Sequence, residues 1–156
     1  MKPYQFITQL ADGAAGEARL DQYFAKWFEI RPATMDEQRR GIDRHFTRRQ
    51  DQAPFSVEYK TDHTAGRTGN AFVETVSVDT QGKPGWAISS HAQLLLYYVP
   101  TSGAIYVIQF KRLREALRIW QQRYPQRAIP NQGYQTHGYL IPLMEFEKIA
   151  VQVLPI

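Results

Sequence analysis

The segment that most constrains the fold is Leu94–Val99, an unbroken run of apolar residues. A short run of this kind is typical of a strand whose two faces are both covered. Thr101-Ser102-Gly103 then connects it to a second apolar segment, Ala104–Phe110. The sequence therefore predicts two neighbouring central strands in a sheet that has other elements packed on each side.

Two segments have the period of amphipathic helices that can cover such a sheet. Between Gly16 and Ile30, apolar residues recur at i, i+4, i+7 and i+8, a spacing that places them on one helical face: Leu20, Phe24, Trp27 and Phe28. We expect Arg31-Pro32 to end this helix, because the residue before a proline avoids the helical region. Between Lys111 and Gln122 the apolar stripe is Leu113, Ala116, Leu117 and Trp120, while Lys111, Arg114 and Arg118 share another face. The first helix is expected on one side of the sheet and the second on the other.

A β-hairpin is predicted in the first half of the chain. A short polar strand, Gly41–Phe46, is followed by a turn that contains Pro54 and by a clearer strand, Phe55–Lys60. In this second strand apolar and polar residues alternate, so Glu58 and Lys60 project from the same face.

The remaining segments complete an α/β fold with a four- to five-stranded mixed sheet flanked by helices. Ala71–Val78 is expected to be a strand, and Pro125–Gly138 is expected to be a loop. A short helix is predicted to end at Ile149, before an apolar tail. With 156 residues, 43% of them hydrophobic, and no internal repeat or linker, the chain is expected to form one domain spanning residues 1–156.

Composition narrows the chemistry and the partners. The chain has no cysteine, so any metal must be held by oxygen or imidazole ligands rather than by thiolates. A net charge of +4 favours an anionic partner, and the basic residues gather in two stretches, around Arg39–Arg49 and Lys111–Arg127. We find neither a signal peptide nor a run long enough to cross a bilayer, which predicts a soluble intracellular, cytoplasmic protein without a membrane partner.

Asp43, Glu58 and Lys60 are the residues that best combine into a hydrolytic centre. Phosphodiester hydrolysis requires neutralisation of the phosphate charge, activation of a water and stabilisation of the leaving oxygen, and carboxylate-bound Mg²⁺ contributes to all three. Asp43 and Glu58 are separated by the hairpin turn, so adjacent strands can bring both carboxylates to one cation. Lys60 adds a compact positive charge that orients or deprotonates the water. The plain structural alternative is a solvated Glu–Lys ion pair on a surface strand.

These motifs resemble those of the PD-(D/E)XK nuclease superfamily, in its small phage, mobile-element and prokaryotic members. The resemblance rests on Asp43, on the stretches Val57–Asp62 and Arg67–Glu74, and on Lys83–Ala87; Ile42 stands where the superfamily name has proline. It implies a restriction-endonuclease-like core and a metal-dependent endonuclease activity, with DNA favoured as substrate. Asp43, Glu58 and the backbone carbonyl of Tyr59 would hold Mg²⁺ or Mn²⁺, and Lys60 would position the attacking water. A homodimer is expected because cutting both strands together requires two sites.

Further residues are weaker candidates for the same site. Glu17 resembles the acid that many members place on the first helix, although the helix dipole alone favours an acid there. Glu74 shares a strand face with Phe72 and Val76, and a half-buried carboxylate needs a partner or a metal. The candidates for nucleic-acid binding are Arg44, Arg48, Asn70, Arg114 and Arg118. A nuclease-fold module that has lost its activity and binds nucleic acid or a protein partner is the alternative function.

Overall fold

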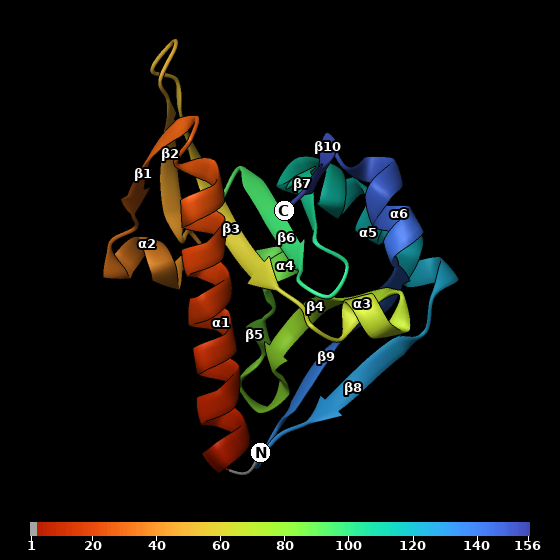
Figure 1. Ribbon diagram of the computed structural model, residues 1–156. Coiled ribbons are helices and arrows are strands. Elements are labelled where there is room, and N and C mark those ends of the chain that lie inside the picture. Colours follow the sequence, from red (N-terminus) through yellow and green to blue (C-terminus); the bar gives the residue numbers. More distant parts are fainter. Residues whose placement is uncertain (1–2) are drawn as a thin grey trace.

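The structure, a computed structural model, describes the backbone of residues 3–156 and the side chains of residues 11–156. It is an α/β protein with two sheets (Figure 1). The larger sheet has six strands in the order β1-β2-β3-β6-β7-β10, where β3 and β6 form its parallel pair and the other neighbours are antiparallel. These strands are β1 (Phe28–Pro32), β2 (Arg44–Arg48), β3 (Pro54–Thr61), β6 (Leu94–Val99), β7 (Ala104–Gln109) and β10 (Gln152–Pro155).

The smaller sheet is antiparallel and has four strands in the order β5-β4-β9-β8. They are β4 (Asn70–Val78), β5 (Lys83–Pro84), β8 (Gln126–Pro130) and β9 (Gln135–Pro142). The helices are α1 (Pro3–Phe24), α2 (Met35–Arg39), α3 (Ala65–Thr68), α4 (Trp86–Ser89), α5 (Phe110–Arg123) and α6 (Leu143–Ile149), with a 3-10 turn at Asp79–Gln81. Among the described helices none is long and apolar enough to cross a membrane.

Side-chain alternation in β6 divides the hydrophobic core between the two faces of the larger sheet. Leu96 packs with Leu20 and Phe24 of α1, whereas Leu95 and its neighbours on the opposite face pack with the apolar stripe of α5. Figure 1 shows α1 extending along one side of the molecule, with α5 and α6 away from it. The predicted strand pair Leu94–Val99 and Ala104–Phe110, and the placement of the two helices on opposite faces, are confirmed.

The predicted limits of the first helix, residues 16–30, are wrong. The helix begins at Pro3 and ends at Phe24, and Phe28 opens strand β1. Phe24 and Phe28 still contact the same ring, that of Phe46, because the strand turns back over the core that the helix covers. Pro32 lies at the end of β1, an edge strand, where a missing backbone donor is tolerated.

The expectation of a loop over residues 125–138 is also wrong, as is that of a single sheet with four or five strands. Gln126–Pro130 forms β8 and pairs with β9. Every residue of β8 is exposed, so this edge strand lacks the apolar alternation that identifies a strand from sequence. The apolar tail likewise forms a strand, β10, which adds to the other edge of the larger sheet.

Candidate active site

The hairpin of β2 and β3 places Asp43 beside the strand that carries Glu58 and Lys60. Register pairing between the two strands ends at Arg44 and Val57, and the backbone N–H of Asp43 still donates to Val57 O over 2.9 Å. At Tyr59, two residues further along β3, no strand residue of β2 remains as a partner. The Asp43 side chain takes that place, because its Oδ2 accepts a hydrogen bond from Tyr59 N at 2.7 Å. The first acid is therefore fixed to the backbone between the second acid and the lysine.

Glu58 and Lys60 lie on the sheet face opposite to α1. Val57 and Tyr59 pack on the α1 side, so the alternating residues Glu58 and Lys60 point the other way. Lys60 Nζ lies 3.0 Å from Glu58 Oε1, and the side chains are 35% and 5% exposed, respectively. The predicted shared face is confirmed, and the pair is too buried to be the solvated surface ladder that was its plain alternative.

The second oxygen of Glu58 is the most unusual atom of this cluster. Glu58 Oε2 is buried and has no hydrogen-bond partner among the described residues. The Ser90 hydroxyl lies close enough to lower the pKa of Glu58, but it donates its single proton to Gly41 O at 2.8 Å. An unpartnered buried carboxylate oxygen is costly, so a cation or proton donor is expected here.

Burial and the neighbouring charges set the ionisation of the site. Burial raises the pKa of Glu58 above its usual value, although the Lys60 ammonium opposes the shift. Burial lowers the pKa of Lys60, but the Glu58 carboxylate outweighs this, with help from Asp43 and Glu74, and the net pKa is raised. Lys60 is therefore an ammonium ion at neutral pH.

Glu74, from β4 of the smaller sheet, approaches the same charges. Burial raises its pKa, and the ammonium of Lys60 and the backbone of Trp86 oppose the shift. Gly85 packs directly on this residue, since a Cβ there would lie 2.5 Å from Glu74 O. The indole of Trp86 in turn lies beneath the lysine, with Lys60 Nζ 5.9 Å from its ring centre. Asp43, Glu58, Lys60 and Glu74 thus belong to one group of interacting charges.

Asp43 and Glu58 have the chemistry that Mg²⁺ or Mn²⁺ requires. Mg²⁺ in proteins is commonly held by one or two carboxylates, with waters and substrate phosphates in the other positions. Among the described residues no three acidic or imidazole side chains enclose a common point. Alternate strand residues direct both backbone groups to the same neighbour, so the carbonyl of Tyr59 faces the edge where its N–H meets Asp43. The donor set of two carboxylates and one carbonyl therefore fits a partly hydrated cation.

Glu17 lies in a different cluster, on the α1 side of the sheet. Its Oε2 lies 3.0 Å from Arg44 Nη2, and Asp21 is at the same distance from that nitrogen. Tyr59 Oη also donates to Asp21, at 2.8 Å. The structure gives Glu17 and Arg44 a role in attaching α1 to the hairpin rather than one beside Glu58.

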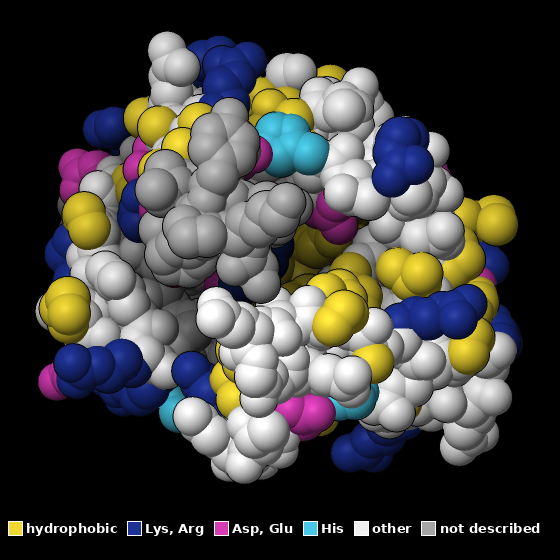
Figure 2. All heavy atoms as spheres, turned by 90° about the horizontal axis from the view of Figure 1, so that it is seen from below, with side chains coloured by type: hydrophobic (Ala, Val, Ile, Leu, Met, Phe, Trp, Pro, Cys, Tyr) yellow, Lys and Arg dark blue, Asp and Glu magenta, His cyan; other side chains and the backbone are white. Residues whose placement is uncertain are grey.

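The other candidate contacts for nucleic acid are dispersed. Arg48 shares the face of Arg44 and Phe46 on β2, towards α1. Arg114 donates from Nε to Ala87 O at 3.2 Å and from Nη2 to Ser90 O, while Arg118 is exposed on the same helix. The amide of Asn70 donates to Thr68 O within the turn before β4. Figure 2 likewise shows lysine and arginine side chains scattered around one face rather than gathered in one patch.

Sequence reasoning assigned no individual role to three residues that shape this cluster: Gly85, Trp86 and Ser90. Gly85 and Trp86 fall in the Lys83–Ala87 stretch of the resemblance, where a glycine before a tryptophan was the available signal. Ser90 carried no signal, because its contact with Gly41 joins segments that are far apart in the chain.

Comparison with known proteins adds no family to this geometry. No protein-family model matches the chain, and neither the curated proteins nor the solved structures give a significant match.

Proposed function

We propose that this protein is a metal-dependent nuclease that hydrolyses phosphodiester bonds, with DNA as its substrate. The observation that carries the proposal is the unpartnered, buried Oε2 of Glu58, which lies in a charge cluster with Asp43 and Lys60. A purely structural ion pair has no need of a second carboxylate or of a buried oxygen left without a donor. A cation between the two carboxylates accounts for both features.

Each residue has a distinct role in this proposal. Asp43 and Glu58, with the Tyr59 carbonyl, hold Mg²⁺ or Mn²⁺, which supplies positive charge to the reacting phosphate and makes water more acidic. Lys60, held by Glu58, directs its ammonium protons to the attacking water and the phosphate oxygens. Because its pKa is raised, Lys60 acts as a charge and hydrogen-bond donor and not as the general base. Glu74, on the smaller sheet, also attracts the ammonium of Lys60 and so limits where that ammonium can move.

The resemblance of the motifs to PD-(D/E)XK nucleases supports the same proposal. The hairpin with an acid beside one strand and Glu-x-Lys on the next, in a mixed sheet with helices on both faces, is compatible with a restriction-endonuclease-like core. The small size of the chain leaves few residues for reading a target sequence, which favours a substrate recognised by its shape or delivered by a partner over a long sequence-specific site. A homodimer would place two such centres on one duplex.

The test is a cleavage assay coupled to a measurement of metal binding. Labelled linear, nicked, flapped and junction DNAs, with RNA for comparison, are incubated in Mg²⁺ and in Mn²⁺. Binding of Mn²⁺ is measured in a separate experiment that does not depend on activity. It is followed by the decrease in the electron paramagnetic resonance signal of the free ion. We expect cleavage and Mn²⁺ binding in the wild type and neither in Glu58→Gln. A folded protein that binds no Mn²⁺ and cuts no substrate would refute the proposal.

An inactive nuclease-fold module is the alternative, because the 3.0 Å contact between Lys60 and Glu58 can also serve as a structural ion pair on β3 without any catalysis. Such a module would bind DNA with an affinity that falls with salt but would cut nothing in either metal. An adaptor for a protein partner would show neither cleavage nor salt-dependent binding of DNA.

A further inference from the structure

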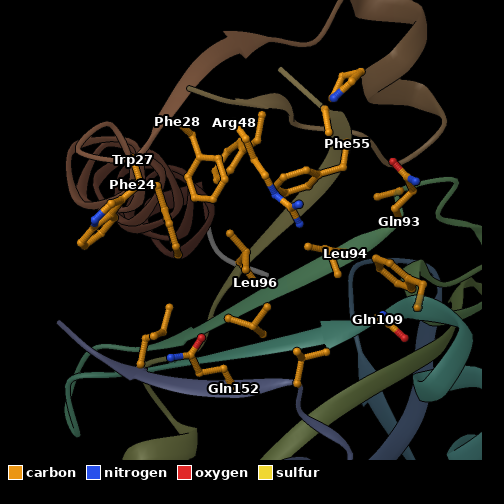
Figure 3. A pocket seen from close by; sticks show the side chains of 18 of the residues that line it. Phe24, Trp27, Phe28, Arg48, Phe55, Gln93, Leu94, Leu96, Gln109 and Gln152 are labelled. Atoms are coloured by element: carbon orange, nitrogen blue, oxygen red, sulfur yellow. The ribbon is translucent and has the colours of Figure 1, made fainter. Parts of the chain in front are cut away.

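A long apolar groove lies on the α1 side of the larger sheet, the face opposite to Glu58 and Lys60. Its volume is about 1300 Å³. The floor is formed by side chains from the central strands: Leu94 and Leu96 of β6, and Val107 of β7. One wall is aromatic and comes from the end of α1 and the start of β1: Phe24, Trp27 and Phe28. Figure 3 shows Phe24 and Phe28 on one side of the groove, towards Leu96, with the ring of Trp27 further out, on the outer side of α1.

The groove exists because α1 covers only part of the sheet face. Helix α1 has its main contacts with β1 and β3, at one end of the strand order. On the face towards α5, Leu95 and Tyr97 of β6 are at most 2% exposed. On the α1 face Leu96 is equally buried, but Leu94 and Tyr98 on either side of it are only half-buried. Trp27 at the rim is 51% exposed. The apolar run of β6 is thus typical of a strand with other elements packed on both faces. Only the face towards α5 is completely covered.

The charged residues that line the groove are all cations: Arg48, Lys111 and Arg114. Arg48 lies over the ring of Phe55 and has a weak, exposed contact with Asp51 at 3.5 Å. In the described part of the chain, Lys111 and Arg114 have no carboxylate within ion-pair distance. The groove therefore combines an apolar floor with a cationic rim.

We infer that this groove binds an amphipathic helix of a partner protein, with apolar residues on the floor and acidic residues at the rim. The volume exceeds the range of about 300–1,000 Å³ common for small-ligand pockets and suits a peptide segment. A helix laid on the uncovered strands would complete the layer that α1 begins, as helix-in-groove recognition does. Acidic residues on its flanks would neutralise Lys111 and Arg48, and charge complementarity of this kind selects partners.

A second copy of this chain fits the groove less well. In a two-fold dimer the same patch meets itself, which would bring the cationic rims of the two copies together. A nucleic-acid strand would meet its cations but would leave the aliphatic floor of Leu94, Leu96 and Val107 without an apolar partner. The inference goes beyond the proposed nuclease activity and does not depend on it, since the two sites lie on opposite faces of the sheet.

The experiment uses the full chain and synthetic helical peptides that contain no tryptophan and are made in two lengths. In the acidic peptides, leucines at i, i+3, i+4 and i+7 form one face and glutamates form the other. Matched control peptides have lysine in place of glutamate, or the same residues in a scrambled order. Trp27 is the reporter, because burial of its exposed ring shifts tryptophan emission to the blue. A Trp27→Phe protein, with binding measured by anisotropy of a labelled peptide, shows that the spectral change comes from the groove.

We expect saturable binding of the acidic peptides that weakens with salt, and little binding of the lysine or scrambled peptides. Lys111→Glu together with Arg48→Glu should weaken binding by about tenfold or more and favour the lysine peptide. Arg112→Glu is the matched control, since this neighbour on α5 is exposed but does not line the groove, and binding should stay within about twofold of wild type.

Three kinds of outcome would overturn the inference. One is the absence of saturable binding for both lengths of acidic peptide. Another is equal binding of the acidic and lysine peptides, or binding that the rim substitutions leave unchanged. The third is a dimer in sedimentation velocity that Lys111→Glu and Arg48→Glu alter, or DNA binding that these substitutions abolish, because the groove would then serve a second copy or nucleic acid.

Discussion

Asp43 is bound through its Oδ2 to the backbone N–H of Tyr59, the residue between Glu58 and Lys60, over 2.7 Å. This bond begins where the register between β2 and β3 ends, so the carboxylate takes the place of a strand partner. The oxygen that accepts the bond is fixed without any metal, while the carboxylate retains its charge for one. Two hydrogen bonds to β3, one from the Asp43 backbone and one to its side chain, therefore position the first acid before any ligand is present.

Two substitutions at Asp43 should separate this structural role from the proposed catalytic one. Asp43→Asn keeps an oxygen for Tyr59 N but loses the charge, so the protein should stay near wild-type stability while cleavage is abolished. Asp43→Ala should abolish cleavage and also lower the free energy of unfolding by about 1–2 kcal/mol, since Tyr59 N–H loses its acceptor in a half-buried position. Urea unfolding beside single-turnover cleavage measures both effects. Near-normal cleavage in Asp43→Asn would eliminate the assignment.

Substitution of Lys60 tests the proposed chemistry in a second way. Lys60→Ala should lower single-turnover cleavage by about 10²–10³-fold, because the ammonium acts mainly on the developing charge of the transition state. Lys60→Arg should not restore the rate, since a planar guanidinium does not occupy the position of a compact ammonium. DNA binding by anisotropy should change little in either variant. Arg112→Glu, an exposed change on α5, is the control for nonspecific loss of charge.

Lys60→Ala should also make the protein less stable at neutral pH, because the buried carboxylate of Glu58 loses the ammonium that neutralises it. Thermal unfolding without metal detects this loss, and Glu58→Gln in the same background should reverse it. A stable Lys60→Ala protein with an unchanged cleavage rate would reduce Lys60 to an ordinary strand residue.

The sequence predicted the central elements because local pattern and burial agree there. The apolar run of β6 and the stripe of α5 are buried on the faces that their periods indicate. The shared face of Glu58 and Lys60 also follows from strand alternation alone. Edge strands were missed, since β8 is exposed along its whole length and has no apolar face to read. The end of α1 was misplaced because Phe28 continues the apolar spacing of the helix from within a strand.

The surroundings of the charge cluster were less accessible to sequence reasoning, because they depend on contacts between distant segments. Arg44 follows Asp43 directly, yet its side chain turns to Glu17 and Asp21 on the opposite face of the sheet. Arg114 was expected to display its charge, but it donates to backbone oxygens of Ala87 and Ser90. The position of a basic residue next to an acid in the sequence does not reveal to which face of the sheet its side chain points.

The 3-10 turn that follows β4 contains a carboxylate whose effect on stability should depend on pH. Asp79 Oδ1 accepts from Gln135 N at 2.9 Å and from Thr80 N, and Oδ2 lies 3.2 Å from His137 Nε2. The hydrogen bond from the Gln135 backbone, followed by His137, holds the pKa of Asp79 below its usual value of 3.8. A lowered folded-state pKa means that the unfolded chain binds more protons, so this stabilisation is present above 3.8 and is lost as the pH falls through the lowered value.

Asp79→Asn should therefore lower the stability near pH 6 and make little difference at a pH below the lowered pKa of Asp79. Urea unfolding at several pH values between these limits measures the gap between the variant and the wild type. Glu115→Gln, which removes an exposed acidic side chain on α5, is the control for a change of net charge alone, and near pH 6 it should alter stability less than Asp79→Asn does. A gap for Asp79→Asn that is constant down to the lowest pH would contradict the assignment of the stabilisation to its charge.

Two glycines of α1 allow a matched test of how this helix packs on the sheet. A Cβ at Gly13 would meet nothing within 4 Å, whereas a Cβ at Gly16 would lie 2.1 Å from Thr61 Oγ1 and 2.9 Å from Thr61 Cβ. Gly13→Ala should raise the free energy of unfolding by up to about 1 kcal/mol, because alanine is the better helix former. Gly16→Ala has the same helical gain but should lower stability by about 1–3 kcal/mol, since the β-branched Thr61 can move little and α1 must shift.

Thr61→Ala combined with Gly16→Ala should recover part of the loss, measured as the coupling term of a double-mutant cycle in urea unfolding. Equal stabilisation by both glycine substitutions would mean that α1 does not approach β3 as closely as the structure places it.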